Sequence, residues 1–426
     1  MFKLGVLVIL TCCGLGAEVR TLTMRQAIEL ALKQNPELTL ARLEEKKAEQ
    51  DVRLARDAFV PKVVAGSGLA YSSGFPMSIE GATPSVIQAR AIADVFNRPQ
   101  SYRVAAAKEH RRGAAIDTAA KQQEIAWRTA ELYLDAEKAA RMAEIASRQV
   151  EALDQIAATV QARVAEGREL PIEARRAALN VARARHRLQV LESDCAYAEG
   201  SLAEVLGLDP ADRVRAAPED RTPPPVPASP EEAVQTALST SKEIRSLESK
   251  LLAKGFDIRA ERAARLPRFD LVAQYALLGR FNNYEDFFRK FQRHNGQLGV
   301  SIQIPVFTGP GVAAATAQAE AEAARLRLEV QSARRRISTE TVRRFEELRQ
   351  AESALQLARM ELDVAREQVS ILLAQMQEGR VGLRQIEEAR SAETDKWMLF
   401  FEANATLEKA RLCLLKQTGT LLAAMQ

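Results

Sequence analysis

Histidine, a frequent catalytic and metal-binding residue, occurs only three times in this 426-residue chain, at scattered positions. The three histidines, His110, His186 and His294, do not have the spacing of metal ligands. No glycine-rich loop that would hold a phosphate is present, and there is no nucleophile elbow. The sequence therefore argues against an enzyme and offers no residues for a catalytic, cofactor or metal site.

The N-terminus indicates export. Residues 1–17 are predicted to be a secretory signal peptide, with Lys3 before a short apolar run and cleavage near Gly16 or Ala17. Cys12 and Cys13 leave lipidation of the N-terminus as an alternative, although the residues before them match a lipidation site poorly.

Composition excludes further classes of protein. A net charge of +4 with 27% charged residues of mixed sign gives no basic field of the size that nucleic acid requires. After the signal, no apolar run has the length of a transmembrane helix. Cys195 and Cys413 would remain in the mature chain, and two lone cysteines do not make a disulfide framework.

A long helical hairpin is encoded twice. Apolar residues recur at alternating steps of four and three, the period of helices packed in a left-handed supercoil. The first stripe comprises Leu132, Ala136, Ala139, Ala143, Ala146, Val150, Leu153, Ala157, Val160 and Val164. Adding 212 to each position from Ala136 onward gives Leu348, Ala351, Leu355, Ala358, Leu362, Ala365, Val369, Leu372 and Met376, without a gap. Both stripes run into Glu-Gly-Arg, so each hairpin is predicted to turn at a glycine, Gly167 or Gly379.

A shorter helix precedes each hairpin. Capping-box patterns begin at Thr23 and Ser229. In each, the hydroxyl would accept from a backbone amide of the first turn, and the Gln or Glu side chain three residues later would accept from the backbone amide of the capping residue. The two starts are 206 residues apart (229 − 23), and the same offset relates Pro61 to Pro267, where each helix is expected to end.

Four segments alternate apolar and polar residues, as transmembrane β-strands do. They are residues 62–73, 85–97, 268–279 and 296–307. The alternative is a half-buried strand of a soluble sheet. Because four strands cannot close a membrane barrel, transmembrane strands would require several chains to share one barrel.

The chain is thus predicted to be mainly α with a small membrane β part, built from two tandem structural repeats. Repeat 1 covers residues 18–208 and repeat 2 covers residues 229–426. The linker between them, residues 209–228, is rich in proline and should be extended and free of helix. The longest helices, beginning near Ala105 and Gly311, would each measure roughly 90–100 Å and must pack laterally in a bundle or in the wall of a tube.

One segment resembles a known family. Gly299–Gly309, with the sequence GVSIQIPVFTG, is similar to the strand-to-helix passage of the outer-membrane efflux protein family, the TolC-like channels. Pro305 and Gly309 mark the transition, whereas the first copy, Ala93–Asn97, lacks the proline. The resemblance, which includes the start of each repeat, covers nearly the whole mature chain.

The resemblance implies a homotrimer that completes a β-barrel in outer-membrane lipid and a long-helix α-barrel in the periplasm. Members of the family are passive exit ducts of tripartite efflux pumps or type I secretion systems. A periplasmic adaptor joins them to an inner-membrane transporter. The resemblance implies no cofactor and no nucleic acid. From the residues alone, a periplasmic coiled-coil adaptor and a scaffold protein without a membrane barrel are the alternatives.

The resemblance also implies roles for residues at the two turns. The turns would be periplasmic tips where the adaptor docks, and their residues are Gly167, Arg168, Leu170, Gly379, Arg380 and Val381. The acidic residues just past the tips are candidates for the aperture: Glu173, Glu387 and Glu388. Rings of carboxylates select cations. Glu388 is the better candidate for such a ring, and Glu173 for a contact between helices.

Overall fold

The computed structural model describes residues 19–68, 85–209, 211–217, 219, 221–279, 289 and 292–425. The expected signal peptide, with Cys12 and Cys13, lies outside the described residues, as does the end of the first expected strand, 69–73. The chain forms two compact units. Unit 1 comprises Met1–Leu40, Ala119–Ser241 and Arg335–Gln426, and unit 2 comprises Ala41–Thr118 and Lys242–Arg334.

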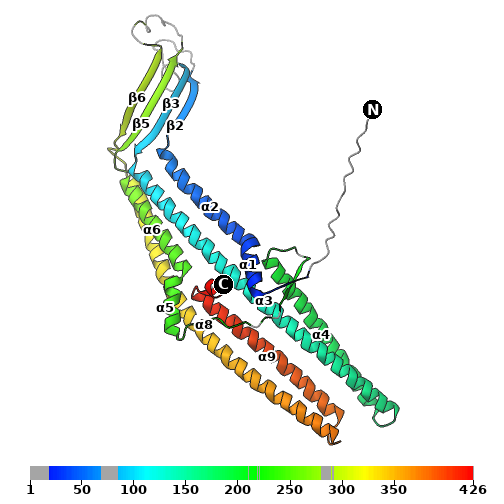
Figure 1. Ribbon diagram of the computed structural model, residues 1–426. Helices are drawn as coiled ribbons and strands as arrows, with labels where there is room; N and C mark the ends of the chain where they lie inside the picture. Colours follow the sequence, from blue (N-terminus) through cyan, green and yellow to red (C-terminus); the bar gives the residue numbers. More distant parts are fainter. Residues whose placement is uncertain are drawn as a thin grey trace, which may run out of the picture. The chain divides into compact units, whose positions relative to one another are not determined.

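The elements follow the same order in both repeats (Figure 1). In the first repeat they are β1 (Val19–Leu22), α1 (Met24–Gln34), α2 (Pro36–Arg56), the 3₁₀ turn η1 (Asp57–Phe59), β2 (Lys62–Gly68), β3 (Ser85–Phe96), α3 (Arg98–Ala165) and α4 (Pro171–Val205). In the linker and the second repeat they are β4 (Arg213–Ala216), α5 (Pro230–Thr240), α6 (Lys242–Ala263), β5 (Arg268–Leu278), β6 (His294–Gln303), α8 (Gly311–Gln377), α9 (Leu383–Gln417) and α10 (Leu421–Ala424).

Each repeat opens with two helices where the sequence analysis expected one. Asn35 separates α1 from α2 with extended backbone (ψ 128°), because the following Pro36 disfavours helical geometry in its predecessor. The Asn35 Oδ1 atom then accepts from the backbone amide of Glu37 at 2.8 Å and starts α2. Ser241, 206 positions later, makes the same break without a proline (ψ 116°).

The predicted caps are present at both starts. Thr23 and Gln26 form a complete capping box, with the two reciprocal bonds at 3.0 and 3.3 Å. Ser229 accepts from the amide of Glu232, but the Glu232 carboxylate accepts from the amide of Ala228, one residue earlier than in a standard box.

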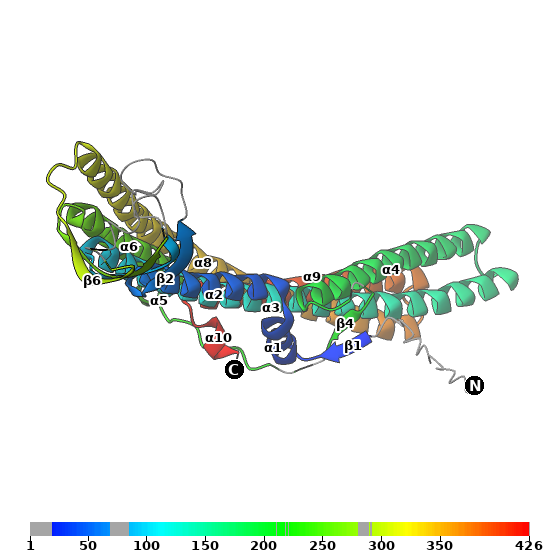
Figure 2. The same cartoon turned by 90° about the horizontal axis from the view of Figure 1, so that it is seen from above.

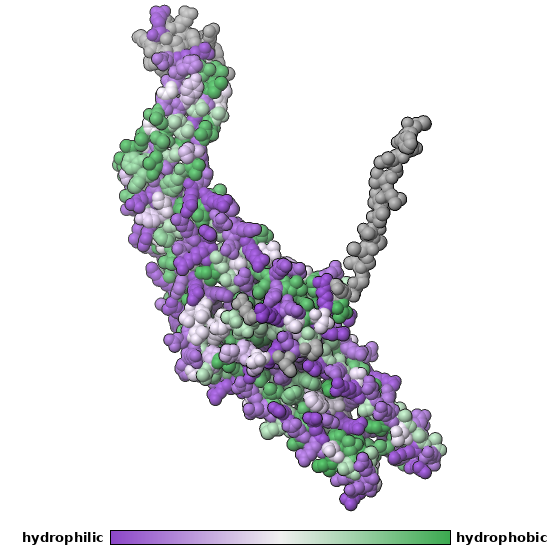
Figure 3. All heavy atoms as spheres, in the orientation of Figure 1, coloured by the Kyte–Doolittle hydropathy of each residue, from purple (hydrophilic) through white to green (hydrophobic). Residues whose placement is uncertain are grey.

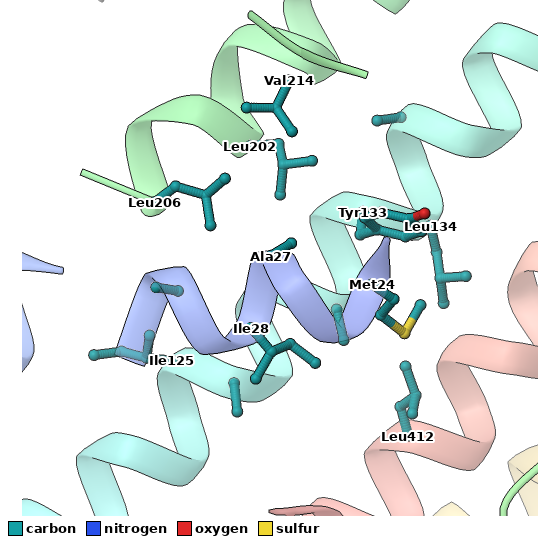
Figure 4. Close-up of a cluster of buried hydrophobic side chains, with 14 of the residues drawn as sticks. Met24, Ala27, Ile28, Ile125, Tyr133, Leu134, Leu202, Leu206, Val214 and Leu412 are labelled. Carbon is teal, nitrogen blue, oxygen red and sulfur yellow. The ribbon is translucent and has the colours of Figure 1, made fainter. Parts of the chain in front are cut away.

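Unit 1 contains the main core. Helix α1 packs against α3, α4 and α9, with β4 at the side (Figure 4). The largest fully buried side chains of this core are Leu38, Ile125, Tyr133, Leu202, Val214, Leu206, Leu415 and Leu421. Within the same unit α3 runs beside α4, and α8 beside α9, as two antiparallel hairpins (Figures 1 and 2).

The linker is extended, but it also carries a strand that the sequence analysis missed. Strand β4 pairs in parallel with β1, from Val19 opposite Arg213 to Leu22 opposite Ala216. Residues Arg213–Ala216 alternate polar and apolar side chains over only four positions, and Val19–Leu22 do not alternate, so only the packed structure identifies this pair.

Unit 2 holds a four-stranded antiparallel sheet in the order β2-β3-β5-β6. Strand β6 ends at Gln303, four residues earlier than predicted. Pro305 has no amide with which to extend the ladder, and the chain leaves the sheet before it. Strands β2 and β6 are the edges of this sheet.

Candidate functional site

The two hairpin turns have the same backbone geometry. Gly167 and Gly379 have φ values of 70° and 73°, in the left-handed region that favours glycine. The amide of Arg168 donates to the carbonyl of Arg163 at 2.8 Å, and that of Arg380 to Gln375 at 2.9 Å, as in a Schellman C-cap. A Cβ atom at either glycine would meet nothing within 4 Å, so conformation alone requires glycine here.

The other predicted tip residues lie at the surface. Arg168 pairs with Glu166, and Arg380 with Glu378, each at 3.1 Å between exposed side chains that contribute little to stability. Leu170 is exposed and is the N-cap residue of α4. Val381 is half-buried in the second turn.

The three acidic candidates have different surroundings. Glu173 pairs with Arg176 on its own helix at 2.9 Å. The contact between helices that we expected of Glu173 is made by Glu387, which accepts from the Asn180 amide nitrogen at 2.8 Å and so joins α9 to α4. Glu388 is well exposed, with the Arg384 guanidinium 3.8 Å away.

Polar contacts that the sequence analysis did not identify join the two hairpins further from the turns. Arg187 on α4 donates to Asp395 on α9 at 2.6 Å. Lys138 on α3 pairs with Glu402 on α9 at 3.0 Å. These partners are more than 200 residues apart, so no local pattern reveals them.

The two hairpins differ at one equivalent pair of positions. Asp154 and Arg185 form an ion pair at 2.9 Å in the first hairpin. Their counterparts 212 residues later are Arg366 and Trp397, which form a cation–π contact at 5.6 Å. Trp397 also stacks on Phe401, and both rings line a groove of about 580 Å³ formed by α3, α8 and α9. The repeat therefore preserves the fold while presenting different surfaces.

Arg221 anchors the linker. Its Nη2 atom lies 2.5 Å from Glu137 on α3 and 3.1 Å from Glu408 on α9. Its guanidinium also covers the ring of the buried Tyr133, whose hydroxyl lies 3.2 Å from the carbonyl oxygen of Leu22 and 3.1 Å from that of Ala217. Burial of Tyr133 raises its pKa to about 12.

The sheet has one apolar face and one mixed, more polar face, which is called the polar face below. The cross-strand pairs Leu271–Val300 and Phe269–Ile302 alternate with Asp270–Ser301 along β5 and β6. Leu298 is 78% exposed, and hydrophobic side chains are visible at the surface of this region (Figure 3). A soluble sheet would cover such a face with other elements.

A β-bulge at Val95 extends the apolar face. Asp94 is opposite Asp270, but Phe96 is opposite Phe269, so Val95 is the extra residue. The shift turns Phe96 to the side of Phe269, with ring centroids 5.5 Å apart. Aromatic residues at the border of an apolar band are typical of membrane strands.

Pro305 and Gly309 lie between β6 and α8, and Gly309 has a φ of 60°. The apolar residues beside them are exposed, Phe307 to 90%. In the first copy a single residue, Asn97, connects β3 to α3, and its side-chain oxygen accepts from the amide of Gln100 at 3.1 Å. This cap explains why α3 begins before Ala105.

Among the described residues, no three His, Cys, Asp or Glu side chains come together as metal ligands would. None of the described helices has the apolar length needed to cross a membrane.

Comparisons with known proteins agree with the resemblance found in the sequence. The sequence model of the family "Outer membrane efflux protein" matches residues 27–208 and 233–424, one match for each repeat. The outer membrane efflux protein BepC of Brucella suis is 21% identical over 405 residues, covering 94% of this chain and 86% of its own.

Solved structures share the fold. The CmeC outer membrane channel of Campylobacter jejuni superposes with a TM-score of 0.77 at 14% identity, covering 93% of this chain and 86% of its own. VceC of Vibrio cholerae gives 0.75 at 16% identity, with 93% and 96% coverage. The family match overturns the adaptor and scaffold alternatives. The chain belongs to the outer membrane efflux protein family and is a TolC-like efflux channel of the outer membrane, in a family of channels and not of enzymes.

Proposed function

We propose that three copies of this chain form the passive exit duct of a tripartite efflux pump or type I secretion system. The observation that carries this proposal is the four-stranded sheet, with its apolar face, its polar face and its edge strands β2 and β6. Pairing β2 of one copy with β6 of the next would satisfy both edges and close a barrel.

The first test is the mass and location of the mature protein. Separated membranes would be extracted with detergent and the purified particle measured by light scattering. A particle of three protomers from the outer membrane is the expected result. A monomer in the periplasmic fraction would contradict the proposal.

The faces of the barrel can be tested on two neighbouring residues. Val300→Cys is expected to resist a water-soluble thiol reagent, because its side chain would face lipid. Ser301→Cys is expected to react, because it would face the water-filled lumen. Equal reactivity would refute the assignment. The parent protein is the control for Cys195 and Cys413, both half-buried.

The hairpin turns are the proposed site of adaptor docking and aperture closure. Exposed Leu170, between the turn and α4, offers apolar surface to an adaptor. Exposed Glu388 is the proposed member of a carboxylate ring, with Glu173 and Glu387 supporting the helices around it. Glu388→Lys is expected to lower cation preference in planar bilayers. Unchanged selectivity would mean that Glu388 does not face the pore.

Docking itself has a separate test. Leu170→Asp should weaken cross-linking to the adaptor and reduce export, whereas the exposed Leu357→Asp, on α8 away from the turns, should not. Equal effects of the two variants would argue against docking at the turn.

A further inference from the structure

Two aspartates face each other at one end of the sheet. Asp94 on β3 and Asp270 on β5 are direct cross-strand partners on the polar face. The bulge at Val95 follows immediately, and then Asn97 leads into α3. Like charges directly opposite each other on neighbouring strands destabilise a sheet, so this pair requires an explanation.

The polar partners present do not satisfy this pair. Asp270 is 4% exposed, and its Oδ2 atom lies 3.3 Å from the Nε atom of Arg268. Its Oδ1 atom is buried and has no hydrogen-bond partner among the residues that the structure describes. Arg268 also donates to the side chain of Gln303 at 2.7 Å. Burying a carboxylate oxygen without a partner is unfavourable.

The surroundings leave the pair with net negative charge. Asp94 accepts from the neutral Asn97 amide at 2.6 Å. The nearby Lys62 pairs with Asp57 at 2.7 Å, and Arg90 is four positions away along β3, about 13 Å in an extended strand. Among the residues that the structure describes, Arg268 is the only cation that forms an ion pair with either aspartate, and it pairs with Asp270. A further positive group would complete the site.

We propose that Asp94 and Asp270 bind a hard divalent cation, of the calcium or magnesium kind, where β3 leads into α3. Carboxylate oxygens are the ligands that such ions prefer, and few protein ligands imply weak binding, with a Kd of about 10⁻⁴–10⁻³ M. The site lies within one chain. Its position on the wall of the pore, as a ring of three sites, rests on the proposed trimer.

The test is thermal unfolding of the detergent-purified protein in millimolar CaCl₂ or MgCl₂, against NaCl of equal ionic strength. The divalent salt is expected to raise the melting temperature of the wild type. Asp270→Asn and Asp94→Asn should abolish this rise, because each removes a charged ligand. Asp57→Asn is the matched control, since its carboxylate already has Lys62, and it should keep the rise. Asp270→Asn should fold, because it has the same shape and removes repulsion.

A wild type that responds to neither divalent ion beyond the effect of ionic strength would overturn the proposal. So would asparagine variants that respond as the wild type does. Light scattering on the same samples separates this proposal from the proposed trimer. If the wild type were a monomer that responds to calcium, and Asp270→Asn abolished the response, only the trimer would be contradicted.

Discussion

Arg221 joins the proline-rich linker to helices from both repeats. Its side chain is 19% exposed and contacts Glu137 on α3 and Glu408 on α9. Its own positive charge is what allows the two carboxylates to lie close together. Desolvation works against this charge, but Glu137 and Glu408 outweigh it and the pKa of Arg221 is raised. At the scale of the residue, a single guanidinium therefore connects three parts of unit 1.

Arg221→Ala should release the linker. Two carboxylates would remain without their partner, at an expected cost of about 2 kcal/mol, below the value for fully buried pairs. This corresponds to a roughly thirtyfold larger open population. The rate at which proteinase K cleaves the linker under native conditions measures this open population. Arg25→Ala, which breaks an exposed pair with Glu29, is the control and should change little. Equal cleavage of both variants would contradict the anchoring role.

Tyr133 should make stability sensitive to alkaline pH. Burial raises its pKa to about 12, so the folded chain keeps a proton that the unfolded chain releases near pH 10. The free energy of unfolding should therefore be unaffected below about pH 10 and fall by up to about 1.4 kcal/mol per pH unit between about 10 and 12. Melting temperatures of Tyr133→Phe should depend less steeply on pH, and those of Tyr197→Phe, which is 79% exposed, should follow the wild type. Parallel curves for all three proteins would argue against this origin.

At the scale of elements, glycines with the same C-cap conformation lie in two different kinds of surroundings. Gly379 and Gly419 both have a φ of 73°. Gly379 is at a hairpin turn with open space around it, whereas a Cβ atom at Gly419 would lie 2.8 Å from the Thr240 hydroxyl oxygen. Gly207 has the same relation to Gln34 in the first repeat, with 3.0 Å to its carbonyl oxygen. Gly207 and Gly419, which follow the second helix of each hairpin, thus also leave room for the end of the first short helix, at Gln34 and Thr240, to pack closely against them.

Alanine substitutions should separate these two effects. Gly379→Ala should cost about 1 kcal/mol, for backbone conformation alone. Gly419→Ala adds a steric clash and should cost roughly 2–3 kcal/mol. Thermal unfolding of the two variants side by side measures the difference. If both lost equal stability, the approach of Thr240 to Gly419 would not matter energetically.

At the scale of the whole molecule, the sheet is incomplete in one chain. A membrane strand must have all its backbone groups paired, and β2 and β6 each lack a neighbour on one side. The helical hairpins have a core of their own, which includes Leu348, Leu407 and Leu414 in the second repeat. In the proposed trimer, the sheet would therefore depend on other copies, whereas the helical hairpins pack within the chain.

Dissociation of the proposed trimer and loss of the strands should coincide. Heating the detergent-purified particle should give one transition, in which the mass falls to that of the monomer while the β-sheet signal is lost. Light scattering and infrared spectroscopy of the same sample measure both. Monomers that retain an intact strand signal would contradict a barrel shared between chains.

The repeated architecture follows from local patterns along the chain. A stripe with steps of three and four, a glycine at each turn and a capping box at each start are local features, so Gly167, Gly379 and Thr23 could be assigned a structural role from their neighbours alone. The alternation around Val300 likewise predicted a two-faced strand, because side chains of a strand alternate by backbone geometry.

The tertiary structure alone decided which distant residues meet. The pair Asn180–Glu387 depends on how α4 and α9 are rotated and aligned, and the pair Arg221–Glu408 depends on how the linker lies against α9. The placement of Asp94 opposite Asp270 depends on strand register and on one bulged residue. These contacts join positions roughly 180 to 210 residues apart, and a shift of one residue would break each of them, so their residue types carry no local signal.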